Sequence, residues 1–237
     1  AVCSARQTPE AGRILREKAR EAHAPLAFAD ELPEGAFPRI GLAGGHQRVN
    51  AGLALAAWRV LAPMLGRGID DADSQRRGIA EAFLPGRFQR VPAGGGIPPL
   101  VLDGAHNPHG TRALAAALKA ERIAPSAVIY SCLRDKDWRS SVAVLKTALN
   151  PGTAVFVPQM DNPRAEDAGV VASFWNEAGC RAEAAAGSRA VAHAVKAAFP
   201  QAGGGGDRPV LITGSLYLLS AFFGLYPELL SISSCEG

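Results

Sequence analysis

Short apolar runs recur at regular intervals along the C-terminal part of the chain. They are LVLD from Leu100, AVIYS from Ala127, AVFVP from Ala154, the weaker AEAAA from Ala182 and PVLITGS from Pro209, which gives intervals of 27, 27, 28 and 27 residues. Short runs rich in Val and Ile are typical of buried β-strands. Intervals of about 30 residues are typical of successive β-α units. The pattern therefore predicts the strands of one parallel sheet.

The residues between these runs have the spacing of helices. Leu114 and Leu118 lie four positions apart within residues 111–120, as expected for one buried helix face. Further helices are predicted over residues 138–149, 165–178 and 188–199. The alternation predicts an α/β fold, a Rossmann-like domain with a mostly parallel, doubly wound sheet. In such a sheet, ligands gather at the carboxyl ends of the strands.

The first 88 residues follow a different pattern. Helices are predicted there over PEAGRILREKAREA from Pro9, NAGLALAAWRVL from Asn50 and SQRRGIAEAFL from Ser74. Few strands are evident, so residues 1–88 are predicted to be the tail of one domain and residues 89–237 a complete second domain.

The longest apolar run is AGLALAAWRVLAPMLG from Ala51, and Arg59 and Pro63 interrupt it. It is shorter than the roughly 20 residues of a membrane span, so we expect a buried helix. The sequence opens with neither a methionine nor a signal-peptide pattern, which suggests that it begins inside a longer protein.

Composition narrows the classes of partner. The chain has 237 residues, 48% of them hydrophobic, and its 25 basic and 22 acidic side chains leave a formal charge of only +3. The charges are interspersed, so neither a nucleic-acid surface nor a membrane-binding patch is indicated, and a small-molecule partner and a monomer are expected. The cysteines lack CxxC or CxxH spacing, which favours a cytoplasmic protein with no cysteine-bound metal; they are Cys3, Cys132, Cys180 and Cys235.

A polar turn follows the first predicted strand of the sheet. In LDGAHNPHG, Asp103 and His106 stand between that strand and a helix, where an open α/β sheet presents side chains to a ligand. Asp103 can accept hydrogen bonds from hydroxyls, and His106 can donate or accept near neutral pH. Alternatively, Asp103 and Asn107 only cap the helix or stabilise the turn. The strand ends SCLRDKD and TGSLYLL place further polar groups on the same edge.

These segments together resemble the folylpolyglutamate synthase and dihydrofolate synthase family of the ATP-dependent Mur ligase superfamily. The resemblance rests on motifs in one order along almost the whole chain: SARQTPEAGRILREKA, GGHQRVNAGLAL, PGRFQRV, LDGAHNPHG, RDKDW, DNPRA and VLITGSLYLL. The family's phosphate-binding loop, of the type Gly-Thr-x-Gly-Lys-[Ser/Thr], does not occur in this sequence. The resemblance therefore implies the end of a central ATPase domain followed by a complete C-terminal domain. The run GGGG at residues 203–206 has no lysine after it and is predicted to be a flexible loop.

The resemblance implies a ligase that joins L-glutamate to the carboxylate of a folate or dihydropteroate. ATP phosphorylates the carboxylate, the glutamate amine attacks the acyl phosphate, and phosphate leaves. The implied substrates and cofactors are the folate or dihydropteroate, L-glutamate, ATP and Mg²⁺, and no residue of this chain is assigned to the metal. Positioning and charge stabilisation carry much of such catalysis.

The resemblance also implies roles for individual residues. Asn50 would bind adenine, Arg87 would contact the nucleotide at the domain linker and Asp103 would hold the ribose. His106 and Ser215 would bind the incoming glutamate, and His106 and Lys136 are the catalytic candidates. An amide suits a base edge, a guanidinium suits phosphate oxygens, and a carboxylate suits a pair of hydroxyls.

Each of these residues also has a structural interpretation. Asn50 is a possible N-cap for the helix that follows it, and Arg87 a solvated linker residue. Ser215 is equally consistent with a turn at a strand end, and Lys136 with a charge cluster at a helix start. At the level of function, two alternatives to a folate ligase stay open. One is a non-catalytic Rossmann-like module that binds a nucleotide or an amino acid, and the other is a different Mur-type amino-acid ligase.

Overall fold

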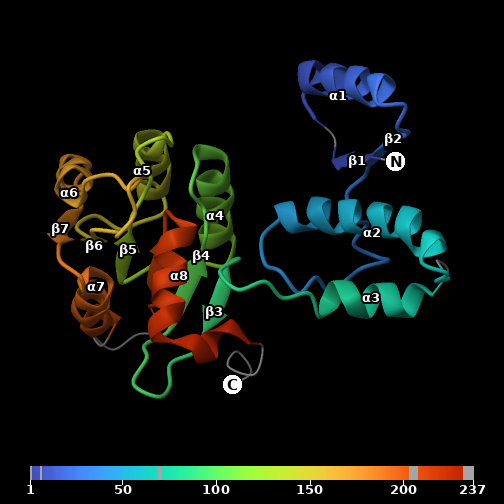
Figure 1. Cartoon of the computed structure of the whole chain (residues 1–237). Helices are drawn as coiled ribbons and strands as arrows, with labels where there is room; N and C mark the ends of the chain where they lie inside the picture. Colours follow the sequence, from blue (N-terminus) through green and yellow to red (C-terminus); the bar gives the residue numbers. More distant parts are fainter. Residues whose placement is uncertain (1, 6, 69–70, 203–207, 232–237) are drawn as a thin grey trace. The chain divides into compact units, whose positions relative to one another are not determined.

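The computed structural model describes every residue except 1, 6, 69–70, 203–207 and 232–237, so the predicted GGGG loop lies outside the described residues. The chain divides into two compact units, Ala1–Phe83 and Leu84–Gly237 (Figure 1). The sequence predicted a boundary after residue 88. Residues 84–88 lie in the second unit, and the assignment of the units to two ligase domains stays a prediction.

The second unit is built on one six-stranded sheet with the strand order β3-β4-β8-β5-β6-β7. Only β3 is antiparallel to its neighbour; the other pairs are parallel. The predicted Rossmann-like, mostly parallel fold is confirmed. The strands are β3 (Gln89–Val91), β4 (Leu100–Asp103), β5 (Ala127–Tyr130), β6 (Ala154–Pro158), β7 (Arg181–Ala185) and β8 (Val210–Thr213). All five predicted strands are present, and β3 was not predicted.

Helices follow the parallel strands in turn. They are α4 (Pro108–Ala120), α5 (Trp138–Lys146), α6 (Ala168–Glu177), α7 (Ala190–Ala198) and α8 (Leu216–Leu225), with short 3-10 helices at Phe199–Ala202 and Pro227–Leu230. Helix α6 begins three residues later than predicted because Ala165 bridges to Leu133 and the Asp167 side chain caps the helix by accepting from the Val170 N–H. Helix α8 was not predicted, because LYLLSAFFGL is apolar on nearly every side and lacks helical periodicity.

Alternate residues of the central strands face opposite layers of helices. Leu102, Ile129 and Ile212 share one core with Val195 of α7 and Phe222 of α8. The strand residues between them, such as Val128 and Leu211, are fully buried on the other face, which α4, α5 and α6 cover (Figure 1). This burial on both faces explains why the strands are continuous apolar runs.

The first unit contains one β-α-β element and two further helices. Strands β1 (Val2–Ala5) and β2 (Leu26–Ala29) are parallel and are connected by α1 (Pro9–Glu21). Helices α2 (His46–Met64) and α3 (Ala72–Ala80) follow. The two strands were missed because their sequences, VCSA and LAFA, are not runs rich in Val and Ile.

The first unit buries few apolar side chains of its own. Its buried apolar residues among those described are Ala19, Ala29, Leu32, Leu55 and Ala62. The apolar run from Ala51 lies in α2, but the expectation that it is buried is wrong for one face. Trp58, Leu61, Met64 and Leu65 are 38%, 50%, 77% and 65% exposed. No described helix is long and apolar enough to cross a membrane.

Candidate functional site

Asp103 is the last residue of β4, and its carboxylate holds two segments of backbone. One carboxylate oxygen accepts from the Ala105 N–H and the other from the Phe88 N–H, both at 2.9 Å. Phe88 and Ala105 are buried, whereas Asp103 is half-buried. Because each carboxylate oxygen has two lone pairs, Asp103 keeps the capacity to accept from a ligand on its solvent side.

The loop that carries Arg87 is fixed to the same end of β4. The Gly104 N–H donates to the Gly86 carbonyl at 2.8 Å, beside the bond from Phe88 to Asp103. Gly86 and Phe88 both have positive φ, of 71° and 45°, so the chain turns sharply on either side of Arg87. The structure therefore shows that the loop of Arg87 and the turn of Asp103 are hydrogen bonded to each other. The sequence did not reveal this connection.

His106 and Asn107 complete the turn after β4. The His106 Nδ1 lies 2.9 Å from the Gly104 carbonyl oxygen. A carbonyl oxygen only accepts, so Nδ1 carries the proton and Nε2 remains for a ligand. The cap of α4 is Asn107, whose side-chain oxygen accepts from the Gly110 N–H at 2.8 Å. Of the two residues considered as possible caps, Asn107 has that role and Asp103 stabilises the turn.

Ser215 follows β8 and is the N-cap of α8. Its hydroxyl oxygen accepts from the Tyr217 N–H at 3.1 Å, and the residue is 1% exposed. Gly214, just before it, has a φ of 101°, and a Cβ there would collide with the Ser131 carbonyl oxygen and the Tyr130 ring. The turn therefore needs glycine, and the Ser215 hydroxyl can still donate its proton toward the edge of the sheet.

Lys136 lies in the loop between β5 and α5 and is half-buried. Next to it, Asp135 accepts from Arg164 at 2.6 Å, and this hydrogen bond holds the pKa of the exposed Asp135 carboxyl below its usual value. Arg164 belongs to the DNPRA segment after β6, so the pair connects two loops at the carboxyl edge. Asp137 caps α5 by accepting from the Ser140 N–H.

Asn50 lies in the first unit, inside α2 rather than at its start. The helix begins at His46, its N-cap is Gly45, and the Asn50 side chain donates to Gln47 at 2.9 Å. The alternative that Asn50 is an N-cap is therefore wrong. Asn50 is exposed on the helix surface.

The structure thus gathers Arg87, Asp103, His106, Lys136 and Ser215 within one unit, at or near the carboxyl ends of three strands. In the sheet, β8 lies between β4 and β5, and Thr213 is in register with both Asp103 and Tyr130. The edge is a topological switch point, because the chain leaves β4 and β8 toward opposite faces. Asn50 belongs to the other unit.

Sequence reasoning missed several polar groups near this edge. Gln89 is 4% exposed, accepts from the Gly86 N–H and donates to the Leu229 carbonyl. In the part of the chain that the structure describes, the buried hydroxyls of Ser131 and Thr213 have no hydrogen-bond partner. Burial raises the pKa of Cys132 to about 12, so this thiol is not a nucleophile near neutral pH. Gln89 could have been found only by recognising that the glutamine of PGRFQRV is buried, which its sequence context does not show.

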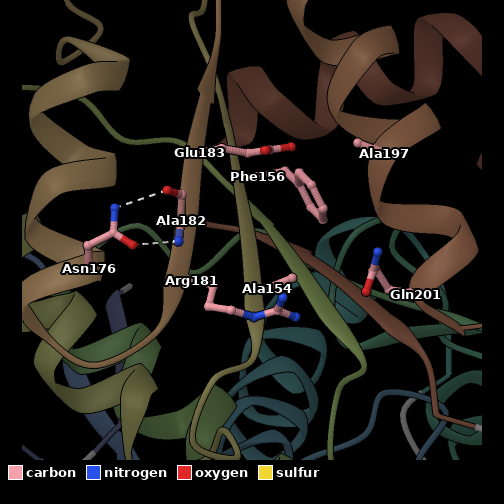
Figure 2. A pocket seen from close by; sticks show the side chains of 8 residues that line it. All are labelled: Ala154, Phe156, Asn176, Arg181, Ala182, Glu183, Ala197 and Gln201. Carbon is pink, nitrogen blue, oxygen red and sulfur yellow. Dashed lines mark hydrogen bonds between the residues drawn. The ribbon is translucent and has the colours of Figure 1, made fainter.

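A hollow of about 420 Å³ lies near the amino-terminal ends of β6 and β7, away from the carboxyl ends that carry the candidate residues (Figure 2). It is lined by Ala154 and Arg181, which begin β6 and β7, and by Asn176. The Asn176 amide pairs with both backbone groups of Ala182, at 3.0 and 2.7 Å, and so blocks part of this exposed strand edge. Parallel sheets bind ligands at the other end of their strands, so this hollow is not the candidate site. The described residues contain no cluster of three or more His, Cys, Asp or Glu that could hold a metal ion.

Comparison with known proteins agrees with the motif resemblance. Residues 86–216 match the family model described as "Mur ligase, glutamate ligase domain". A Bacillus subtilis protein named "Dihydrofolate synthase/folylpolyglutamate synthase" is 32% identical over 216 residues, which are 87% of this chain and 45% of that protein. A Halobacterium salinarum protein named "Probable bifunctional folylpolyglutamate synthase/dihydropteroate synthase" is 36% identical over 181 residues, 76% of this chain and 20% of that protein.

The fold has counterparts among solved structures. A Mycobacterium tuberculosis folylpolyglutamate synthase complexed with ADP and AMPPCP superposes with a TM-score of 0.73 at 26% identity, over 94% of this chain and 54% of that one. The chain therefore spans about half of that structure, and less than half of the two curated relatives.

Proposed function

The chain belongs to the Mur ligase family through its glutamate ligase domain, and from this we propose that its protein joins L-glutamate to the carboxylate of a folate or dihydropteroate at the expense of ATP. The carboxylate attacks the γ-phosphorus of ATP, so that ADP leaves as the acyl phosphate forms. The glutamate amine then adds to the acyl carbon, loses a proton, and expels inorganic phosphate as the amide forms.

Arg87 and Asp103 are proposed to bind the nucleotide. Asp103 is already held by two backbone donors, so its carboxylate is oriented before a ligand arrives and little side-chain entropy is lost on binding. A ribose diol would donate to this carboxylate. Arg87 lies in the loop fixed beside it and would contact phosphate oxygens. Asn50, in the first unit, keeps its predicted role as an adenine ligand.

His106 and Ser215 are proposed to bind the incoming glutamate. His106 offers Nε2, because Nδ1 is occupied by the Gly104 carbonyl, and that nitrogen can accept a proton from the attacking amine. Ser215 can donate to a carboxylate oxygen while its own oxygen accepts from Tyr217. Lys136 would stabilise the charge that develops on the acyl phosphate oxygens. Mg²⁺ is expected to accompany the ATP phosphates, and no step is assigned to a metal ligand of this chain.

The observation that supports this proposal most is that the loop carrying Arg87 is hydrogen bonded to the turn carrying Asp103. Two hydrogen bonds tie the PGRFQ loop to the LDGA turn, from the Phe88 N–H to the Asp103 carboxylate and from the Gly104 N–H to the Gly86 carbonyl, although fifteen positions separate Phe88 from Asp103. A turn that only ended a strand would not need a charged side chain both in the PGRFQ loop and in the LDGA turn. A guanidinium and a carboxylate carried by two segments that are hydrogen bonded to each other at a switch point favour a ligand with both hydroxyls and phosphates.

The proposal predicts that the 237-residue chain alone forms no ADP from ATP, because it lacks a phosphate-binding loop. Joined to a folylpolyglutamate synthase segment that carries such a loop, it should form ADP over many turnovers only when folate and glutamate are both present. A coupled assay for ADP measures this. ADP formation by the chain alone, or continuous ADP formation by the joined protein without glutamate, would contradict the proposal and would favour a different phosphate chemistry.

A further inference from the structure

Gln89 is a polar side chain that lies buried beside the loop of Arg87. Only 4% of the residue is exposed, and it begins β3. Its side-chain oxygen accepts from the Gly86 N–H at 3.0 Å, and its side-chain nitrogen donates to the Leu229 carbonyl at 2.7 Å. One amide therefore connects the PGRFQ loop to the C-terminal 3-10 helix at Pro227–Leu230, although 140 positions separate Gln89 from Leu229.

An amide is the side chain that these two partners require. The Gly86 N–H can only donate and the Leu229 carbonyl can only accept, so position 89 needs an acceptor on one side and a donor on the other. Glutamine offers both without a charge, whereas methionine, of similar length, offers neither. A buried polar group costs free energy unless it is hydrogen bonded. The two bonds therefore fix the Gln89 side chain, and the Gly86 backbone with it.

The C-terminal end of this connection is itself held in the core. Leu229 is 2% exposed and belongs to the same hydrophobic core as Phe222 of α8. The Leu229 N–H donates to the Tyr226 carbonyl at 3.2 Å, and the Tyr226 and Phe222 rings pack together with their centroids 4.9 Å apart. The Leu229 carbonyl is therefore a fixed acceptor for Gln89.

Arg87 stands between two residues whose backbone N–H groups are both bound by side chains. Gln89 accepts from Gly86, which precedes Arg87, and Asp103 accepts from Phe88, which follows it. The backbone of Arg87 is thus held on both sides, while its side chain is half-buried. A guanidinium whose backbone is already in place loses less conformational entropy when it binds phosphate oxygens.

Resting on the proposed contact of Arg87 with the nucleotide, we infer that Gln89 is a positioning residue for nucleotide binding. Gln89 lies between Gly86 and Leu229 and acts through the backbone of Arg87. It makes the position of Arg87 depend on the C-terminal 3-10 helix, whereas Asp103 makes it depend on the end of β4. A residue that only satisfied two buried backbone groups would affect folding alone.

Equilibrium dialysis of ATP, without folate or glutamate, tests this inference in the protein joined to a phosphate-loop segment. Gln89→Met and Arg87→Ala should each raise the Kd for ATP about 10-fold. The double variant should also be raised about 10-fold, rather than about 100-fold, because Gln89 acts through Arg87. Gln89→Asn keeps the amide but is too short to reach both partners, and it gives the same comparison if Gln89→Met does not fold.

Thr153→Val is the matched control. Thr153 is 5% exposed, lies just before β6 and donates to the Asn150 carbonyl at 2.8 Å. Its substitution also removes a buried hydrogen bond, but at the amino-terminal end of the sheet. It should lower the melting temperature, as Gln89→Met does, and keep the Kd of the parent protein. Amide hydrogen exchange in the 237-residue chain should become faster at residues 86–88 in Gln89→Met and stay unchanged there in Thr153→Val.

An unchanged Kd for ATP in folded Gln89→Met, or a double variant near 100-fold, would overturn the inference and leave the proposed ligase untouched. A joined protein that binds ATP but forms no ADP with folate and glutamate would overturn the proposed function, while the Kd values would still decide the role of Gln89. A joined protein that binds no ATP would overturn both.

Discussion

Residues 84–237 expressed alone are expected to unfold in one cooperative transition, whereas residues 1–83 alone are expected to show none. The second unit has a complete six-stranded sheet with helices on both faces and fully buried side chains such as Leu102, Ile212 and Phe222. A core of this kind supports a domain stability of roughly 5–15 kcal/mol. The cut falls before Leu84 because the loop at residues 84–88 is hydrogen bonded to the end of β4.

The first unit lacks these features. It has only one parallel pair of strands, and parallel sheets are normally covered on both faces. Its buried apolar residues include three alanines, Ala19, Ala29 and Ala62, whereas Trp58 and Met64 remain exposed. Circular dichroism during thermal melting distinguishes the two fragments. A sharp melt of residues 1–83 would show that the first unit folds on its own, and a gradual melt of residues 84–237 would show that the second unit does not; either result would contradict the prediction.

Asp103→Ala is expected to change both stability and nucleotide use. The substitution leaves the buried N–H groups of Phe88 and Ala105 without their acceptor, which costs roughly 1–3 kcal/mol. It also removes one of the two hydrogen bonds that hold the loop of Arg87 to the end of β4. In the protein joined to a phosphate-loop segment, the loss of charged hydrogen bonds to the ribose should therefore raise the KM for ATP by about one to two decades.

Asp167→Ala is the matched control for this substitution. Asp167 caps α6 by accepting one N–H, so its loss should cost about 1 kcal/mol of stability and leave the KM for ATP unchanged. Thermal melts and ATP titrations of both variants are compared. If Asp103→Ala were destabilised but had the KM of the control, Asp103 would be a structural residue, and the ribose assignment would be wrong.

The central strands β4, β5, β6 and β8 were predictable because each is buried on both faces. Val128, Ile129 and Leu211 cannot be polar there, so the apolar runs stand out at every β-α repeat. Strand β3 escaped prediction because its buried Gln89 is stabilised by specific partners, the Gly86 N–H and the Leu229 carbonyl. Because glutamine is a polar residue, nothing in the sequence indicated that position 89 is buried.

The candidate site was only partly predictable. The motifs pointed to Arg87 and Asp103 separately, but their joining depends on the positive φ of Gly86 and Phe88 and on bonds across the sheet edge.

The transfer of oxygen from the folate carboxylate tests the central claim most directly. The folate is labelled in its reacting carboxylate with a heavy isotope of oxygen and incubated with ATP, glutamate and the protein joined to a phosphate-loop segment. If an acyl phosphate forms and glutamate displaces it, the released phosphate carries the label and the folate gains the mass of one glutamyl residue. Unlabelled phosphate, or a folate without added glutamate, would contradict the account.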